Sequence, residues 1–232
     1  MIGIFDSGIG GYSSLRRLKN LLPKADICYL ADRRNAPYGT KSQTELERLV
    51  LNDVKILKKL GATEILAACC TASTVIDELP EKLREGVYTI IEPAASAAVK
   101  QTRNGRIAVI CTYATAKSSA FERAALRINP DIEIWTQPSK ILVELAEGGV
   151  CDGNCDKSRL DIIKAELKAL SCFDADTVIL GCTHFTLMKN IISSCLHANC
   201  VSAADEGARL ISHRLKNEGN GKLTYVCPEA LA

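Results

Sequence analysis

Two cysteines, Cys69 and Cys182, stand in matching local sequences about half a chain apart. Each follows an apolar run typical of a buried strand and precedes hydroxyl-bearing residues that open a helix. The start of a helix offers unpaired backbone N–H groups and the positive end of the helix dipole, which stabilise a thiolate, lower its pKa and bind a carboxylate. Either segment alone is equally well explained as a small buried residue at a tight corner. The matched pair instead predicts two reactive thiols that act on an anionic substrate.

A glycine-rich segment, Asp6–Gly11, follows the first apolar run of the chain. Its glycines allow a ligand to approach the backbone closely, and Asp6 and Ser7 add polar groups at the end of the expected strand. The spacing differs from that of a dinucleotide-binding loop, because Ser13 occupies the position of the third glycine and no Gly-Lys-Ser/Thr follows. A second segment, Ala36-Pro-Tyr-Gly39, has the composition of an ordinary turn.

Short β-type runs alternate with amphipathic helical patterns along the chain, which predicts an α/β fold with mainly parallel sheets flanked by helices. Ser42 and Glu45 form a capping box before a helix that Gly61 ends, and a second helix is expected around residues 160–170. Ligands of such sheets bind beyond the carboxyl ends of the strands, where both cysteines are expected. The predicted strands are Ile2–Phe5, Ile27–Ala31, Glu64–Ala68, Tyr88–Ile91, Arg106–Cys111, Ile132–Trp135, Thr177–Leu180 and Cys200–Ala203.

Composition excludes several classes of protein. The 232 residues are 47% hydrophobic and 24% charged, and a formal net charge of +2 is too small to indicate a nucleic-acid or membrane-surface partner. No apolar run has the roughly 18–20 residues needed to span a bilayer, and the N-terminal residues resemble a first strand more than a signal peptide. We therefore expect a cytoplasmic protein, in which the eleven cysteines are buried small residues, catalytic thiols or metal ligands more often than disulfide partners.

The other cysteines and histidines are weak candidates for a metal site. Cys151 and Cys155, and Cys195 with His197 and Cys200, could be arranged as zinc ligands, but neither group has the usual Cys-x2-Cys spacing. Surface or core positions explain them better, and no bound metal is expected. His197 and His213 are interpreted as exposed residues at helix ends.

Six blocks in the sequence carry a family resemblance: Asp-Ser-Gly-Ile-Gly-Gly, Ala-Pro-Tyr-Gly, Ala-Cys-x-Thr-Ala-Ser, Ile-Glu-Pro-Ala, Thr-x-x-Thr-x-x-Ser and Gly-Cys-Thr-His. In this order they resemble the glutamate racemases of the aspartate/glutamate racemase superfamily, from about residue 2 to about residue 210. The resemblance implies two similar α/β domains, residues 1–92 with 205–232 and residues 93–204, around an interdomain cleft that holds the active site.

The resemblance also implies roles for individual residues. Cys69 and Cys182 match the two catalytic cysteines that face each other across the substrate Cα, and Asp6 and His184 match the groups that assist them. Glu144 matches a carboxylate near the second cysteine. The positions that match substrate-binding residues are Ser7, Pro37, Tyr38, Gly39, Cys70, Thr71, Thr115 and Thr183.

The implied activity is racemisation of glutamate without a cofactor, with one thiolate removing the Cα proton and an opposed thiol returning one. The resemblance implies that D-glutamate serves bacterial peptidoglycan synthesis. The sequence leaves the oligomeric state open, and a homodimer is compatible with it. Cys70 departs from the family, which ordinarily has a substrate-binding Asn there, and a thiol is a poor hydrogen-bonding group. Two alternatives therefore remain: a racemase of another substrate, such as aspartate or a hydantoin, and a catalytically silent member that binds an amino acid or a protein partner.

Overall fold

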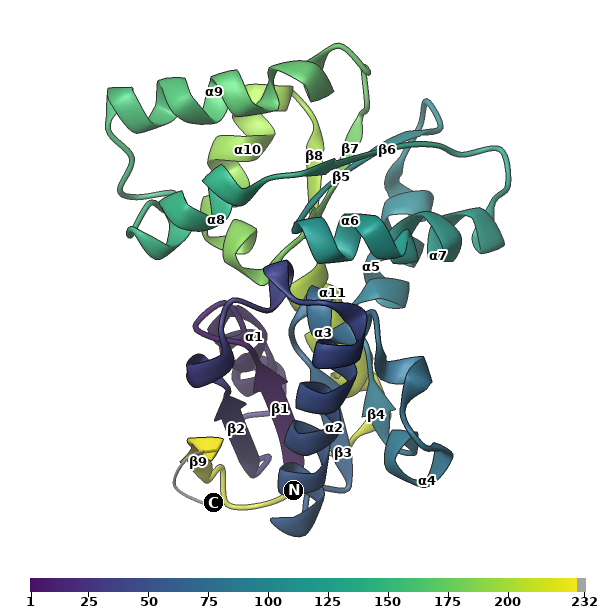
Figure 1. Ribbon diagram of the computed structural model, residues 1–232, viewed down its shortest axis with the longest axis vertical. Helices are drawn as coiled ribbons and strands as arrows, with labels where there is room; N and C mark the ends of the chain where they lie inside the picture. The colour runs from purple at the N-terminus through teal and green to yellow at the C-terminus, as the bar shows by residue number, and fades with distance from the viewer. Residues whose placement is uncertain (229–232) are drawn as a thin grey trace. The chain divides into compact units, whose positions relative to one another are not determined.

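The computed structural model describes residues 1–228 and divides the chain into two compact units. Unit 1 comprises Met1–Ile90 and the C-terminal segment from Ala204, and unit 2 comprises Ile91–Ala203. Each unit has its own parallel sheet flanked by helices (Figure 1). The predicted α/β fold is confirmed.

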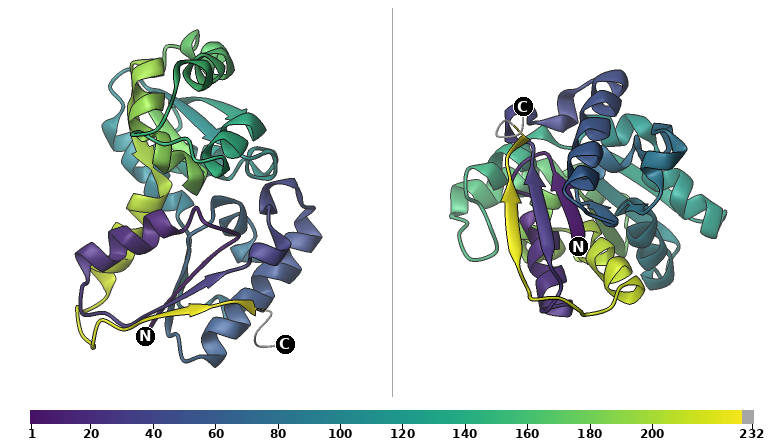
Figure 2. Two further views of the ribbon diagram at one scale, coloured as in Figure 1. Left: turned by 90° about the vertical axis from the view of Figure 1, so that its left-hand side faces the viewer. Right: turned by 90° about the horizontal axis from the view of Figure 1, so that it is seen from below.

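The sheet of unit 1 has the order β4-β3-β1-β2-β9, and every neighbouring pair of strands is parallel. Its central strand, β1, is buried throughout, as expected of a parallel strand covered on both faces. Figure 2 shows α1 and α11 on one face of this sheet and α2 on the other. The strands are β1 (Ile2–Asp6), β2 (Ile27–Ala31), β3 (Glu64–Ala67), β4 (Val87–Tyr88) and β9 (Leu223–Val226).

The longest helix, α2 (Gln43–Lys59), has the boundaries that its sequence signals predict. The side chain of Ser42 accepts a hydrogen bond from the backbone N–H of Glu45, and Gly61 follows the last turn with a φ of +92°. The other helices of unit 1 are α1 (Tyr12–Leu21), α3 (Cys70–Ser73), α4 (Glu81–Arg84) and α11 (Ala203–Arg214), with 3₁₀ turns η1 (Arg33–Asn35), η2 (Tyr38–Thr40) and η3 (Ile76–Glu78).

The sheet of unit 2 has the order β6-β5-β7-β8 and is also parallel. One face packs against α8, α9 and α10 through apolar residues of β5 and β7, and α5 and α7 lie on the other face (Figure 1). The strands are β5 (Arg106–Cys111), β6 (Glu133–Pro138), β7 (Thr177–Gly181) and β8 (Asn199–Ser202). The helices are α5 (Ile91–Gln101), α6 (Tyr113–Ser118), α7 (Ala120–Ile128), α8 (Lys140–Glu147), α9 (Lys157–Ser171), α10 (Lys189–Leu196) and the 3₁₀ segment η4 (Thr183–Met188).

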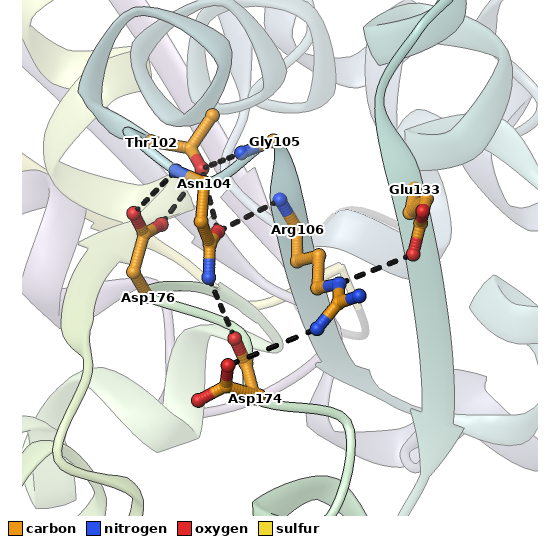
Figure 3. Close-up of polar contacts among 7 residues, drawn as sticks. All are labelled: Thr102, Asn104, Gly105, Arg106, Glu133, Asp174 and Asp176. Atoms are coloured by element: carbon orange, nitrogen blue, oxygen red, sulfur yellow. Dashed lines mark hydrogen bonds and ion pairs between the residues drawn. The ribbon is translucent and has the colours of Figure 1, made fainter.

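A polar network joins the turns before β5 and β7 (Figure 3). The carboxylate of Asp176 accepts hydrogen bonds from the Thr102 hydroxyl at 2.7 Å and from the backbone N–H groups of Arg103 at 2.7 Å and Asn104 at 3.0 Å. Partial burial alone would raise the pKa of Asp176, but the hydrogen bonds to its charged form together outweigh burial and lower the pKa. The network lies at the amino ends of the strands, opposite the edge that carries Cys182.

One predicted strand is largely wrong. Only Val87–Tyr88 of this region pairs with β3, and Ile91 begins α5. The apolar run from Tyr88 to Ile91 is as typical of the buried start of a helix as of a strand, so periodicity does not separate them. Pro93 lies in the first turn of α5, where its missing N–H is not needed. The other predicted strands agree with the structure to within a few residues at their ends, and the predicted helix around residues 160–170 is α9.

Among residues 1–228, the structure contains no helix long and apolar enough to cross a membrane.

Candidate active site

The first cysteine, Cys69, lies beside Asp6 and Ser7 at the carboxyl edge of the sheet of unit 1. Asp6 ends β1 and Cys69 follows β3, and the two strands pair in register, so residues 63 positions apart come together. Asp6 is fully buried and Cys69 is 6% exposed. The Asp6 carboxylate accepts a hydrogen bond of 2.8 Å from the backbone N–H of Gly8.

Gly11 allows α1 to begin against this carboxylate. A Cβ at that position would lie 2.5 Å from Cβ of Asp6 and 2.7 Å from the hydroxyl oxygen of Tyr29. Any larger residue would displace either Asp6 or the first turn of α1. At Gly11 the close approach is between α1 and side chains of the protein itself, whereas the predicted approach of a ligand to this segment stays a prediction.

The Cys69 thiol is a weak acid in the free protein. Burial is the main cause, and the Asp6 carboxylate adds to it, so that the pKa of Cys69 is raised to about 11. Hydrogen bonds from the backbone N–H of Ala72 and from Ser7 act in the opposite direction, with the Ser7 Oγ 3.7 Å from Sγ. The prediction of a lowered pKa at this corner is therefore wrong for Cys69, because a one-turn helix does not outweigh burial and a neighbouring carboxylate.

The two residues that follow Cys69 begin a short helix. Cys70 and Thr71 are the first two residues of α3, and both are buried. Cys69 has an extended backbone immediately before this helix. The local geometry is the strand–cysteine–helix corner that the sequence predicted.

The segment Pro37–Gly39 combines an exposed backbone with one buried side chain. Pro37 is exposed and Gly39 is half-buried, whereas the Tyr38 side chain is 1% exposed. The Tyr38 hydroxyl oxygen lies 2.7 Å from Oδ2 of Asp32 and 2.9 Å from Oδ2 of Asp53. The phenol is thus held inside unit 1. If this segment binds the substrate as predicted, its exposed backbone makes the contact.

In unit 2, Cys182 follows β7 and lies beside His184. Its Sγ is 3.6 Å from Nδ1 of the imidazole, and both residues are buried. Gly181 permits the corner, since a Cβ there would lie 2.8 Å from the Phe121 ring and 3.0 Å from Cβ of Cys111. Thr183 is the first residue of η4 and is also buried.

Thr115 lies at the same edge of the sheet as Cys182. Thr112 follows β5, the neighbour of β7, and its hydroxyl caps α6 by accepting the backbone N–H of Thr115. The two hydroxyl oxygens are 3.0 Å apart, and Thr115 is buried. The structure therefore gathers the predicted residues Thr115, Cys182, Thr183 and His184 at one edge of unit 2.

The two acidic residues of α8 differ in their neighbours. Glu144, which the sequence interpretation assigns to the site, forms an ion pair of 3.2 Å with Lys140 on the exposed side of the helix. The Glu147 carboxylate instead lies 3.7 Å from Nε2 of His184. That nitrogen is buried and has no hydrogen-bond partner among the described residues, and the Glu147 carboxylate is the negative charge that faces it.

The residues considered as metal ligands lie elsewhere. No group of three or more histidine, cysteine or acidic side chains in the described part of the chain could hold a metal ion. All eleven cysteines are free. His197 is exposed at the end of α10 and His213 is exposed in the last turn of α11, as predicted.

Comparison with known proteins places this arrangement in a family. The sequence pattern of the family described as Asp/Glu/Hydantoin racemase matches residues 13–211, most of the chain. The chain belongs to this family. A glutamate racemase of Geobacter metallireducens is 37% identical to it over 218 residues, which cover 93% of this chain and 80% of the relative.

Solved structures of glutamate racemases are similar in fold to this chain. The structure of a glutamate racemase isoform from Bacillus anthracis superposes with a TM-score of 0.87 at 30% identity, covering 98% of this chain and 87% of that one. A glutamate racemase from Francisella tularensis, solved in complex with D-glutamate, gives a TM-score of 0.88 at 26% identity and covers 97% and 87% of the two chains.

Glu147 is the residue near a racemase cysteine that sequence reasoning missed. It follows Glu144 by three residues, so both belong to neighbouring turns of one helix and periodicity does not separate them. One signal was available: Lys140 precedes Glu144 by four residues, a spacing that favours an ion pair between these two side chains. Because Glu144 pairs with Lys140, Glu147 is the acidic residue of α8 that faces His184.

Proposed function

We propose that this racemase interconverts L- and D-glutamate without a cofactor and thereby supplies D-glutamate for peptidoglycan. One observation carries the proposal: each unit presents a buried cysteine at the carboxyl edge of its sheet, beside a group able to influence its proton. Asp6 and Ser7 accompany Cys69, and His184 accompanies Cys182. The similarity to glutamate racemases over nearly the full chain supports glutamate as the substrate.

The proposed reaction is a proton exchange at Cα. The thiolate of one cysteine removes the Cα proton and becomes a thiol, while the thiol of the other delivers a proton to the opposite face and becomes a thiolate. Roles exchange in the reverse direction, so the active enzyme holds one cysteine in each protonation state. Donors around the substrate carboxylates and exclusion of water stabilise the carbanionic transition state.

The environments of the two thiols suit opposite protonation states. A Cys69 pKa of about 11 keeps that thiol protonated near neutral pH, ready to deliver a proton. The imidazole nitrogen of His184 lies 3.6 Å from Cys182 and is a base able to accept its proton. When Cys69 must act as the base, the substrate ammonium group supplies a positive charge that offsets Asp6 and favours the thiolate.

We assign the remaining predicted residues to substrate binding. Ser7, the backbone of Pro37–Gly39, Cys70 and Thr71 serve this role in unit 1, and Thr115 and Thr183 serve it in unit 2. Their placement at the two carboxyl edges supports the assignment. We also propose that the two domains are residues 1–92 with 205–232 and residues 93–204. We propose in addition that the protein is cytoplasmic, in keeping with its many cysteines. Its oligomeric state is proposed to be a homodimer.

Exchange of the Cα proton tests the proposal. The purified protein, without added cofactor, is expected to incorporate deuterium at Cα of L- and D-glutamate in heavy water. Cys69→Ser and Cys182→Ser are expected to abolish racemisation, and Cys172→Ser, which changes an exposed cysteine, serves as the matched control. Exchange with aspartate or a hydantoin but not glutamate would favour the alternative substrate, and exchange with none would favour a silent binding protein.

A further inference from the structure

Helix α2 carries one acidic residue on its otherwise apolar buried face. Asp53 is 1% exposed and lies between Val50 and Val54, which are fully buried on the same helix. Burial of a lone carboxylate is unfavourable unless the charge is paired or neutralised. No cationic side chain contacts Asp53 among the described residues, and its carboxyl group is hydrogen-bonded to the Tyr38 hydroxyl.

The distances around Tyr38 require a further proton. The phenol oxygen lies within hydrogen-bond distance of two carboxyl oxygens, one from Asp32 and one from Asp53. A phenol has one proton to donate, and an ionised carboxylate has none. Two carboxylates therefore cannot both bond to one phenol oxygen, and one of the two carboxyl groups is the donor.

The surroundings assign that proton to Asp53. The side-chain amide of Asn35 donates to Asp32, with Nδ2 2.9 Å from each carboxyl oxygen, so both oxygens of Asp32 already act as acceptors. No amide or cationic group donates to Asp53 among the described residues, and burial together with the nearby Asp32 and Asp6 carboxylates raises its pKa well above the ordinary value. The chain therefore runs in one direction: Asp53 donates to Tyr38, and Tyr38 donates to Asp32.

We propose that Asp53 stays protonated in the folded protein and is a positioning residue, which through Tyr38 fixes the segment Pro37–Gly39 that we assign to substrate binding. This inference rests on the proposed function. Tyr38 is the buried side chain of an otherwise exposed segment, and its 3₁₀ turn, η2, contacts α3, the helix that begins next to Cys69. Loss of the proton from Asp53 would place two carboxylates around one phenol and displace the segment.

The protonation state is measured first, without any substrate. Carbon NMR of isotope-labelled aspartate reports each carboxyl group, and the Asp53 signal is the one missing from Asp53→Asn. We expect that signal to have the shift of a neutral carboxylic acid at neutral pH. A signal that titrates in the ordinary range of an exposed aspartate would overturn the proposal.

The positioning role is measured by amide hydrogen exchange in the segment, again without substrate. Asp53→Leu and Tyr38→Phe remove the donor chain and are expected to speed exchange of the amides in residues 36–41 while the sheet of unit 1 is unaffected. Asp53→Asn keeps a donor, because its amide N–H can bond the phenol oxygen, and is expected to match the parent protein. Equal exchange in all four proteins, or equal acceleration in Asp53→Asn and Asp53→Leu, would contradict positioning through this hydrogen bond.

Kinetics then connect the segment to catalysis. Asp53→Leu and Tyr38→Phe are expected to raise KM for glutamate about tenfold, the order of one or two lost hydrogen bonds, with a much smaller change in kcat. Asp53→Asn is expected to have the KM of the parent protein. Glu47→Gln, which neutralises a half-buried acid on the same helix that bonds to Gln43, is the control. An unchanged KM in both disruptive variants would refute the link to the substrate. A parent protein that turns over no amino acid would refute the proposed function, while NMR and exchange still decide the state of Asp53.

Discussion

The Sγ atom of Cys182 lies 3.6 Å from Nδ1 of His184, within hydrogen-bond reach for a thiol. An imidazole that accepts the thiol proton at Nδ1 carries its other proton on Nε2, which faces the carboxylate of Glu147 at 3.7 Å. Glu147 is half exposed, so its charge stabilises the imidazolium only modestly. The three groups form a thiol–imidazole–carboxylate series in unit 2.

This series predicts different effects for the two acids of α8. Glu147→Gln is expected to lower kcat about two- to fivefold, the range of a solvent-screened ion pair. Glu144→Gln is expected to have a smaller effect, because its carboxylate pairs with Lys140. His184→Asn, which removes the proton acceptor itself, is expected to lower kcat by about a hundredfold or more. Steady-state racemisation assays in both directions measure all three, and a larger loss in Glu144→Gln than in Glu147→Gln would restore the assignment made from sequence.

The reactivity of Cys69 is expected to depend on Asp6. Burial raises the pKa of the thiol most, and the Asp6 carboxylate raises it further, to about 11 in total. Asp6→Asn removes the second cause, so alkylation of Cys69 by iodoacetamide should begin at lower pH while remaining slow near neutrality. Mass spectrometry of the peptide containing Cys69 gives the rate, with the peptide of exposed Cys172 as the internal reference. An identical pH profile in both proteins would mean that Asp6 does not act on this thiol.

The sequence predicted the structural features that depend on local pattern. It did not predict the features that depend on residues far apart in the chain. The strand–cysteine–helix corners and the limits of α2 follow from periodicity, capping and turn chemistry, whereas most of the other residues at the two sheet edges were implied by the family resemblance. The sign of the pKa shift at Cys69 does not, because Asp6 reaches it only through the pairing of β1 with β3. Likewise, nothing near Asp53 in the sequence indicates Tyr38 as its partner, since the loop before α2 brings them together.

Cys70 sets a test of substrate preference. It is buried as the first residue of α3, where the resemblance leads us to expect an Asn that binds the substrate. If the thiol is only a handicap, Cys70→Asn should improve kcat/KM for glutamate by about tenfold or more, the value of a regained hydrogen bond to a charged group. Assays with glutamate and aspartate in parallel measure the change. Lower activity on glutamate would instead indicate that Cys70 belongs to an altered specificity.

The network around Asp176 predicts a stability effect confined to unit 2. Asp176→Asn weakens four hydrogen bonds to the charged carboxylate, including one from the Thr177 hydroxyl, and is expected to reduce the free energy of unfolding by about 1–3 kcal/mol. Because the folded-state pKa of Asp176 is lowered, its contribution is present above the ordinary pKa of 3.8 and is lost as pH falls below it. Urea unfolding followed by fluorescence of Trp135, the single tryptophan of the chain, reports this unit. Asp161→Asn, on the exposed face of α9, is the control, and an equal effect in both variants would contradict the role of the network.

The buried carboxyl of Asp53 predicts the opposite dependence on pH. Its folded-state pKa is raised by burial, then by the nearby Asp32 carboxylate and also by that of Asp6. Between the ordinary value of 3.8 and the raised value, the folded protein holds a proton that the unfolded chain has released, so the free energy of unfolding falls as pH rises. Asp53→Asn lacks this linkage, and its stability relative to the parent protein should grow with pH by up to about 1.4 kcal/mol per unit. Urea titrations between about pH 5 and about pH 8 measure the difference, and Glu47→Gln should show no such trend. A difference that stays constant over this range would show that Asp53 is ionised in the folded protein.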